Sequence, residues 1–219
     1  IQEETGLPYA SQVPGRMHAC GHDGHTAMLL GAARYLAETR NFAGTAVVIF
    51  QPAEEGGGGG KAMVEDGLMD RFAIDEVYGM HTLPGFPAGH FALRPGPLLA
   101  ASDRFEILIE AKGTHAAKPH LGIDAVNIGC QLQQALQSIV ARNVNPLESA
   151  VVSLTMFHAG DASNIIPHTA KLAGTVRTLK DKVRRKVMER MQAIVDGLAL
   201  MHGAKVVLNY DQGYPVTVN

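Results

Sequence analysis

The order of hydrophobic patterns between residues 103 and 210 constrains the fold of this chain more than any other feature. Apolar and polar side chains alternate over 103–111, which is typical of an antiparallel strand buried on one face. Apolar residues at helical spacing over 124–142 and 182–201 predict two amphipathic helices. Three further apolar segments have the length of strands: 150–157, 170–178 and 204–210. The resulting order, β-α-β-β-α-β, predicts a ferredoxin-like α+β sandwich.

The first part of the chain has a different character, because helix and strand patterns alternate there. The apolar run at 44–52 is rich in valine and isoleucine, which predicts a strand buried on both faces in a parallel sheet. A second short strand is predicted at 75–81, and helices are predicted at 24–39 and 60–70. These segments predict an α/β module.

The two patterns meet at a stretch rich in proline and glycine, RPGPL at 94–98, which predicts a hinge. A chain of 219 residues, 46% of them hydrophobic, can build two small domains with cores of their own. We therefore predict a mixed α/β protein with an α/β part at 1–97 and an α+β part at 98–211.

Charge and cysteine content limit the partners and the location that we expect. The net charge of −2 does not favour binding to nucleic acid or to a membrane surface. The sequence contains neither a secretory signal nor an apolar run of the roughly 18 residues that a membrane span needs. With only two cysteines, Cys20 and Cys130, we expect a cytoplasmic protein.

Residues 51–63 read QPAEEGGGGGKAM, two glutamates followed by five glycines. A phosphate-binding loop is excluded, because Glu55 replaces its leading glycine and Ala62 replaces its Mg²⁺-binding hydroxyl. A flexible linker does not fit between a predicted buried strand and a helix. Two interpretations remain open: a turn with two solvated glutamates, or a strand end that points Glu54 and Glu55 into a cleft.

The segment MHACGHDGH at 17–25 holds one thiol, three imidazoles and a carboxylate. Thiolate and neutral imidazole are the ligands that zinc-class ions prefer, and carboxylates complete such sites. The alternative is a buried cysteine beside surface histidines, but five potential ligands in nine residues favour a metal site. His81 ends the strand predicted at 75–81, and carboxyl ends of strands meet at one edge of an open sheet. We therefore expect His81 near Cys20 and Glu54.

Three further candidates lie in the second module, in KGTHAAKPH, GDASNIIPHT and GTVRT: His115, Asn164 and Arg177. Each residue alone is typical of an ordinary loop or strand edge. Together they supply an imidazole, an amide and a guanidinium, which can polarise a carbonyl group and hold a carboxylate.

Five motifs in this order carry a resemblance to a known family: MHACGHDGHTAMLLGAA, FQPAEEGGGGGKAM, YGMHTLPGFPAG, KGTHAAKPHLGIDAV and SNIIPHTAKLAGTVRT. They resemble the M20 metallopeptidases, and within them the amidohydrolase branch of hippurate hydrolases, N-acyl-amino-acid amidohydrolases and auxin-conjugate hydrolases. The resemblance implies part of a catalytic α/β domain of the two-metal aminopeptidase-like fold. It also implies an inserted ferredoxin-like lid that forms a homodimer, with 212–219 returning to the catalytic domain.

The resemblance also implies roles for individual residues. Two divalent ions (Zn, Mn, Co or Ni) are implied, and four residues match the family's ligands: Cys20, His22, Glu55 and His81. Glu54 matches the general base. By the same comparison, His18 and His25 are not ligands.

In the second module, the resemblance implies that His115 stabilises the oxyanion and reaches the partner subunit's site. Asn164 and Arg177 match residues that orient the substrate amide and its carboxylate. The family also has an aspartate-bearing strand before the first segment seen here and a histidine ligand after the lid. Neither occurs in these 219 residues, so we expect either that the sequence is part of a longer protein or that its site is incomplete.

The function implied is hydrolysis of the amide bond of an N-acyl amino acid by metal-activated water. Two alternatives stay open: deacetylation of a precursor such as N-acetyl-diaminopimelate, and a non-catalytic dimerisation or binding module. The expected partners are a small-molecule substrate and a second copy of the chain.

Overall fold

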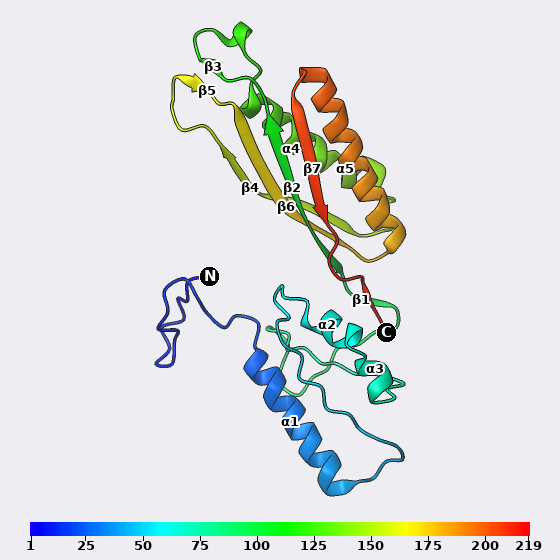
Figure 1. The fold of residues 1–219 in the computed structure, drawn as a ribbon. Helices are drawn as coiled ribbons and strands as arrows, with labels where there is room; N and C mark the ends of the chain where they lie inside the picture. Colours follow the sequence, from blue (N-terminus) through cyan, green and yellow to red (C-terminus); the bar gives the residue numbers. More distant parts are fainter. The chain divides into compact units, whose positions relative to one another are not determined.

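The computed structural model describes residues 1–219, which form two compact units, Ile1–His90 and Phe91–Asn219 (Figure 1). The sequence-based boundary, between residues 97 and 98, lies a few residues further along the chain. The catalytic and lid roles of the two parts stay predictions. No helix of the structure has both the length and the apolar character needed to cross a membrane.

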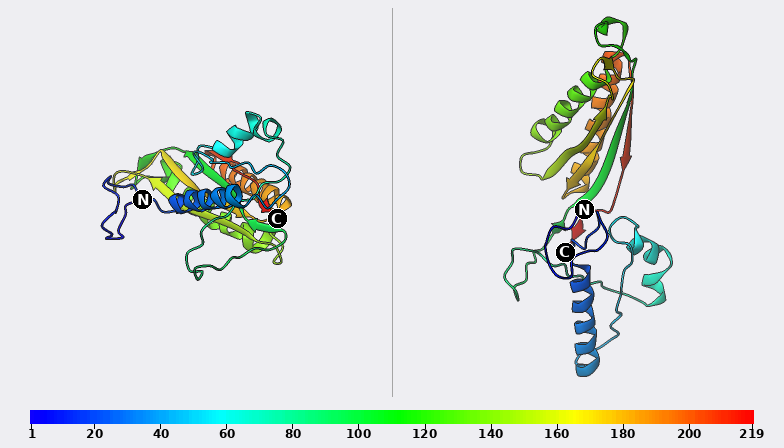
Figure 2. Two further views of the ribbon diagram at one scale, coloured as in Figure 1. Left: turned by 90° about the horizontal axis from the view of Figure 1, so that it is seen from below. Right: turned by 90° about the vertical axis from the view of Figure 1, so that its left-hand side faces the viewer.

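The second unit is a four-stranded antiparallel sheet with two helices on one face (Figures 1 and 2). The strands lie in the order β4-β6-β2-β7. Their bounds are Ala101–Glu110 for β2, Ala150–Ala159 for β4, Thr169–Thr178 for β6 and Lys205–Asp211 for β7. The helices are α4 (Ala125–Asn143) and α5 (Asp181–His202). The predicted β-α-β-β-α-β order is confirmed.

Alternation along β2 explains why this sheet has one covered face. Phe105, Ile107 and Ile109 are almost fully buried, while the residues between them are more exposed. The covered face packs against apolar positions of α4 and α5, including Leu132 and Met191. Burial of these side chains supplies most of the driving force for folding of the unit.

Two helix ends in this unit have common capping patterns. The Asp124 carboxylate accepts hydrogen bonds from the backbone N–H groups of Val126 and Asn127, at 2.9 and 3.0 Å, and so caps α4. Gly203 ends α5 in a left-handed conformation with φ of 65°.

Short strand pairs extend the unit at both ends of the sheet. β3 (Thr114–His115) pairs with β5 (Ile165–Ile166), and the 3₁₀ helix η1 (Pro119–Leu121) follows β3. β1 (Pro97–Leu99) pairs with β8 (Thr217–Val218). The second unit extends to Asn219. The return of 212–219 to a catalytic domain stays a prediction.

The first unit contains α1 (His22–Thr39), α2 (Gly59–Glu65) and α3 (Leu68–Arg71). The helix predicted at 60–70 is divided in two at Gly67, which has a φ of 87°.

The two strands predicted in the first unit, at 44–52 and 75–81, are wrong. Neither segment forms a strand, and neither pairs with another part of the unit. The physical reason is that a strand exists through hydrogen bonds to a neighbour, which an apolar run alone does not supply. Val48, Phe50 and Val77 are accordingly exposed.

Candidate metal centre and catalytic site

The first two predicted ligands flank the start of α1. Cys20 lies two residues before His22, the first helical residue, and Gly21 between them is left-handed with φ of 83°. The ligand atoms of Cys20, His22 and Glu55 all lie within 4.8 Å of one another. The structure therefore brings a thiol, an imidazole and a carboxylate together from two separate segments.

Glu54 and Glu55 lie on the turn that precedes α2. His22 Nε2 lies 3.5 Å from Glu54 Oε2 and 3.5 Å from Glu55 Oε1, so one imidazole contacts both carboxylates. Both glutamate side chains are exposed. Ala53, just before them, has a φ of 52°, which is uncommon for a residue with a side chain. The backbone is therefore held in a strained conformation where it presents the two carboxylates.

The glycine run lets α2 start directly against this turn. Gly59 is buried, and a Cβ atom there would lie 1.8 Å from the carbonyl oxygen of Pro52. A Cβ atom on Gly57 would lie 2.5 Å from the Cβ atom of Ala53. Side chains do not fit at such distances, so these two positions require glycine for close backbone approach. The run is a packed turn.

His81 completes the group of predicted ligands. Its Nε2 atom lies 3.2 Å from Cys20 Sγ, and its Nδ1 atom lies 2.6 Å from the carbonyl oxygen of Thr82. Because a carbonyl oxygen only accepts hydrogen bonds, Nδ1 carries the proton and donates it. In the neutral ring, Nε2 then has a free lone pair directed at the thiol.

His25 has a different environment, although it belongs to the same motif. Its Nε2 atom accepts a hydrogen bond from the backbone N–H of Thr82 at 3.0 Å and lies 3.0 Å from Thr82 Oγ1. The His25 and His81 rings are 4.3 Å apart, centre to centre. His18, the remaining histidine of the motif, is exposed. Sequence reasoning missed the contact between His25 and Thr82, since it joins residues 57 positions apart.

Two pKa shifts describe the electrostatics of this group. Burial raises the pKa of the Cys20 thiol, and the negative charges of Glu55 and Glu54 raise it further. Burial lowers the pKa of His25, and the imidazoles of His81 and His22 add to this effect. A cation bound beside the thiol would act in the opposite direction and favour the thiolate.

The donor set fits a divalent ion of the zinc class. Such ions bind thiolate, imidazole and carboxylate together, and the group contains all three. The backbone hydrogen bond of His81 adds the outer contact that commonly fixes the ring of a histidine ligand.

The second unit brings two of its three candidates together. β3 carries His115, and the backbone N–H of Ala116 donates to the carbonyl oxygen of Asn164 at 2.9 Å. His115 Nδ1 accepts from the backbone N–H of Ala117 at 3.0 Å, so the neutral ring carries its proton on Nε2.

Arg177 lies at the other end of the sheet. It is opposite Ser102 at the start of β2, whereas Thr169 is opposite Glu110 at the end of that strand. Eight residues of strand, roughly 26 Å, separate these two levels. The Arg177 guanidinium donates a hydrogen bond to the Val176 carbonyl oxygen at 3.0 Å.

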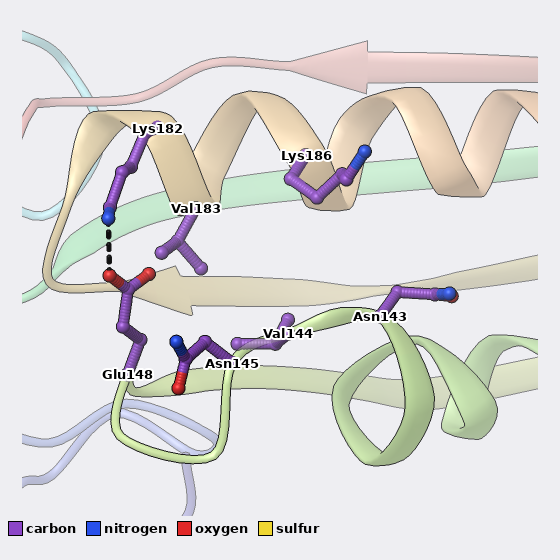
Figure 3. A pocket seen from close by; sticks show the side chains of 7 residues that line it. All are labelled: Asn143, Val144, Asn145, Glu148, Lys182, Val183 and Lys186. Carbon is purple, nitrogen blue, oxygen red and sulfur yellow. Dashed lines mark ion pairs between the residues drawn. The ribbon is translucent and has the colours of Figure 1, made fainter.

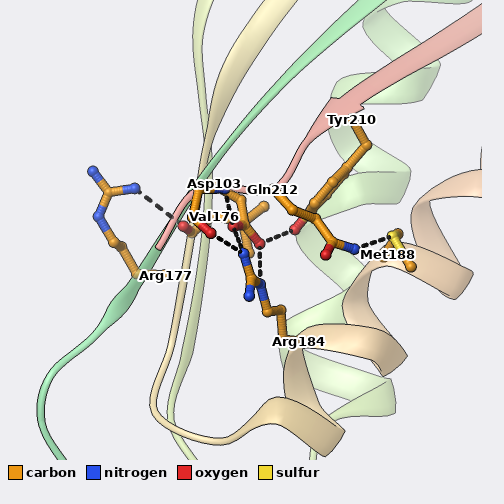
Figure 4. Close-up of polar contacts among 8 residues, drawn as sticks. Asp103, Val176, Arg177, Arg184, Met188, Tyr210 and Gln212 are labelled. Carbon is orange, nitrogen blue, oxygen red and sulfur yellow. Dashed lines mark hydrogen bonds and ion pairs between the residues drawn. The ribbon is translucent and has the colours of Figure 1, made fainter. Parts of the chain in front are cut away.

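A buried polar network near Arg177 escaped sequence reasoning (Figure 4). Asp103 is 1% exposed and accepts hydrogen bonds from Arg184, from the Tyr210 hydroxyl at 2.7 Å and from the Gly213 N–H at 3.0 Å. Burial opposes ionisation of Asp103, but these hydrogen bonds outweigh it and lower its pKa. The available signal was an aspartate at an inward position of an alternating strand.

A pocket of about 240 Å³ in the second unit lies between the end of α4 and the start of α5 (Figure 3). In this pocket Lys182 Nζ lies 2.6 Å from a Glu148 carboxylate oxygen, and Lys186 adds a second cation to the lining. No cysteine or histidine lines it. Its lining supplies no group of the predicted site.

The amino-acid sequence is similar to those of curated enzymes named as a deacetylase and a hydrolase. N-acetyl-L-cysteine deacetylase of Bacillus subtilis (strain 168) is 46% identical over all of this chain and 52% of its own length. Hippurate hydrolase of Campylobacter jejuni is 45% identical over all of this chain and 57% of its own length. The chain therefore spans about half the length of the curated relatives that it matches.

This chain is also similar to a solved structure over about half of that protein's length. The YXEP protein of Bacillus subtilis, described as a dinuclear metal-binding peptidase from the M20 family, matches all of this chain and 55% of its own. The TM-score is 0.77 and the sequence identity 38%. A sequence model of peptidase family M20/M25/M40 matches residues 1–219. The chain belongs to peptidase family M20/M25/M40.

Proposed function

We propose that the protein is a metal-dependent amidohydrolase that cleaves the amide bond of N-acyl amino acids. One observation carries the proposal: the ligand atoms of Cys20, His22 and Glu55 lie within 4.8 Å of one another. Glu54 and His81 lie directly beside this group. A group of metal ligands next to a spare carboxylate is the arrangement that metal-assisted hydrolysis requires.

Four residues would hold the metal in this proposal: Cys20, His22, Glu55 and His81. Two divalent ions bound there would polarise the substrate carbonyl and lower the pKa of water. The four side chains differ in softness, and zinc, manganese, cobalt and nickel all remain candidates.

Glu54 is the proposed general base. Its carboxylate contacts His22 but is otherwise open to solvent, so it can accept a proton from the attacking water. The same proton would pass to the leaving nitrogen as the C–N bond breaks, giving a carboxylic acid and a free amino acid. Glu54 then returns to its ionised form, and the reaction balances as hydrolysis.

The second unit is proposed to act as a lid that completes the site. The proton on His115 Nε2 would donate a hydrogen bond to the oxyanion, which the tautomer described above supports. Asn164 would orient the amide beside His115. Arg177 lies at the other end of the sheet, so the Arg177 that pairs with the carboxylate of a given substrate would belong to a different subunit from its His115 and Asn164.

We also propose a homodimer formed through the second unit, with His115 reaching the partner subunit's site. An edge strand, β4, supports this proposal, since it exposes Val151 and Met156. The two free cysteines, Cys20 and Cys130, support a cytoplasmic location.

The relatives support an N-acyl amino acid as the substrate class. One is named for N-acetyl-L-cysteine and the other for hippurate, so the acyl group differs between them. We propose the amino-acid carboxylate as the shared recognition element.

The test uses the full-length protein. We expect about two divalent ions per chain by elemental analysis, hydrolysis of hippurate or N-acetyl amino acids, and loss of that activity after chelation. A panel that includes N-acetyl-diaminopimelate would identify the preferred acyl group and amino acid. A full-length protein without bound metal and without amidase activity would instead favour the non-catalytic binding module.

A further inference from the structure

We propose that His25 is a positioning residue for the metal centre: it holds Thr82, and Thr82 in turn orients the His81 ring. This inference rests on the proposed function, because His81 is a metal ligand only in that proposal. It gives a role to the one histidine of the MHACGHDGH motif that is neither a proposed ligand nor exposed.

The first link joins His25 to Thr82. The backbone N–H of Thr82 donates to His25 Nε2 at 3.0 Å, and Thr82 Oγ1 lies 3.0 Å from the same nitrogen. A backbone N–H can only donate, so His25 Nε2 is the acceptor and carries no proton. Its lone pair is used within the protein and is not available to a metal.

The second link joins Thr82 to His81. The carbonyl oxygen of Thr82 accepts the Nδ1 proton of His81 at 2.6 Å, which sets the orientation and the tautomer of that ring. His81 Nε2 is then directed at Cys20 Sγ, 3.2 Å away. His25 fixes the backbone of Thr82, and Thr82 orients the His81 ring. His25 therefore acts on His81 Nε2 through Thr82 alone.

The frame for both links is the first turn of α1. His22 and His25 are three residues apart on this helix, and their ring centres are 5.7 Å apart. Thr82 packs closely against Gly21, the residue before α1. A Cβ atom built on Gly21 would lie only 3.0 Å from Thr82 Oγ1. The proposed ligand His22 thus lies on α1 itself, whereas the proposed ligand His81 is linked to α1 through Thr82 and His25.

The test compares His25→Ala and His25→Gln in the full-length protein, with His18→Ala as the matched control from the same motif. Glutamine keeps an acceptor atom for the Thr82 N–H, and alanine removes it. Co²⁺ serves as the probe, with its affinity measured against a competing chelator and its visible absorption spectrum reporting ligand geometry. Hydrogen exchange of the peptide containing Thr82 is measured in the metal-free protein.

We expect His25→Ala to weaken Co²⁺ binding by about 10- to 100-fold, to change the spectrum and to speed exchange at Thr82. His25→Gln should restore part of each property, and His18→Ala should match the wild type. A merely stabilising role would lower the melting temperature but leave the Co²⁺ spectrum unchanged, and that result would overturn the inference.

Two outcomes separate this inference from the proposed function. A wild-type protein that fails to bind Co²⁺ would refute the proposed metal centre itself. A wild type that binds Co²⁺ with the same affinity and spectrum as His25→Ala would refute the positioning role alone. If His25→Ala does not fold, His25→Gln decides: protection at Thr82 together with lost Co²⁺ affinity would contradict the inference.

Discussion

Arg184 Nε donates a hydrogen bond to Asp103 Oδ2 across 2.9 Å, and both residues are buried within the second unit. The guanidinium also donates to the Gly213 carbonyl oxygen at 2.8 Å, while the Gly213 N–H donates to Asp103. The pair therefore binds the start of β2, the first turns of α5 and the segment after β7 to one another (Figure 4).

Arg184→Leu should destabilise the second unit by about 3 kcal/mol, because it leaves the Asp103 carboxylate buried without its cation. Urea unfolding followed by circular dichroism measures the loss. Arg185→Leu is the matched control, since Arg185 pairs with Asp181 on the exposed face of the same helix. Its effect should stay below about 1 kcal/mol. Equal losses in the two variants would contradict the importance of the buried pair.

The stability contributed by Asp103 should disappear in acid. Its pKa is lowered in the folded protein, so its contribution is fully present above the pKa of the unfolded state, about 3.9. The contribution is lost as the pH falls through the lower folded pKa. The stability difference between the wild type and Asp103→Asn should therefore be constant from about pH 5 to 7 and shrink below about pH 4. Urea midpoints measured over pH 3–7 test this, and a difference that does not change with pH would be inconsistent with it.

Gly59→Ala should disturb the metal centre. The new Cβ atom would collide with the Pro52 carbonyl oxygen and displace either α2 or the turn that carries Glu55. We expect weaker Co²⁺ binding in the full-length protein, measured by chelator competition. Gly197→Ala is the matched control, because that helical glycine has open space around it and alanine favours a helix by up to about 1 kcal/mol. Unchanged affinity in Gly59→Ala would show that the close approach is not needed.

Substitution of Glu54 and of Glu55 should have different effects on kcat and on metal content. Glu54→Gln should lower kcat by about 10²- to 10⁴-fold while the metal content stays at the wild-type level, because only the proton acceptor is lost. Glu55→Gln should lower the metal content as well, because it removes a proposed ligand. Elemental analysis and steady-state kinetics on the full-length protein distinguish them. Reversed behaviour of the two variants would exchange their proposed roles.

The fold of the second unit was predictable from sequence because its hydrophobic pattern matches the contacts that it makes. In β2, the alternation that begins at Phe105 corresponds directly to one face covered by helices. The strands expected at 44–52 and 75–81 failed for the complementary reason. Their apolar character describes a preference for burial, whereas a strand also needs a hydrogen-bonded neighbour.

The predicted metal ligands could be found from the sequence because reactive side chains are close together in short motifs. Cys20, His22 and Glu55 were expected together, and the structure places their ligand atoms within 4.8 Å of one another. The tether between His25 and Thr82 was not predictable, because a histidine that accepts a backbone hydrogen bond has no sequence signature.

The pairing of β1 with β8 has a mechanical consequence. Gly96 and Asn219 exchange two backbone hydrogen bonds, of 2.9 and 3.1 Å, so these two residues lie side by side next to the β1–β8 ribbon. Tension applied between these two points would peel β1 from β8 by breaking their hydrogen bonds in succession. The four-stranded sheet would carry load only after that ribbon had opened, which makes the ribbon the first element to yield under force.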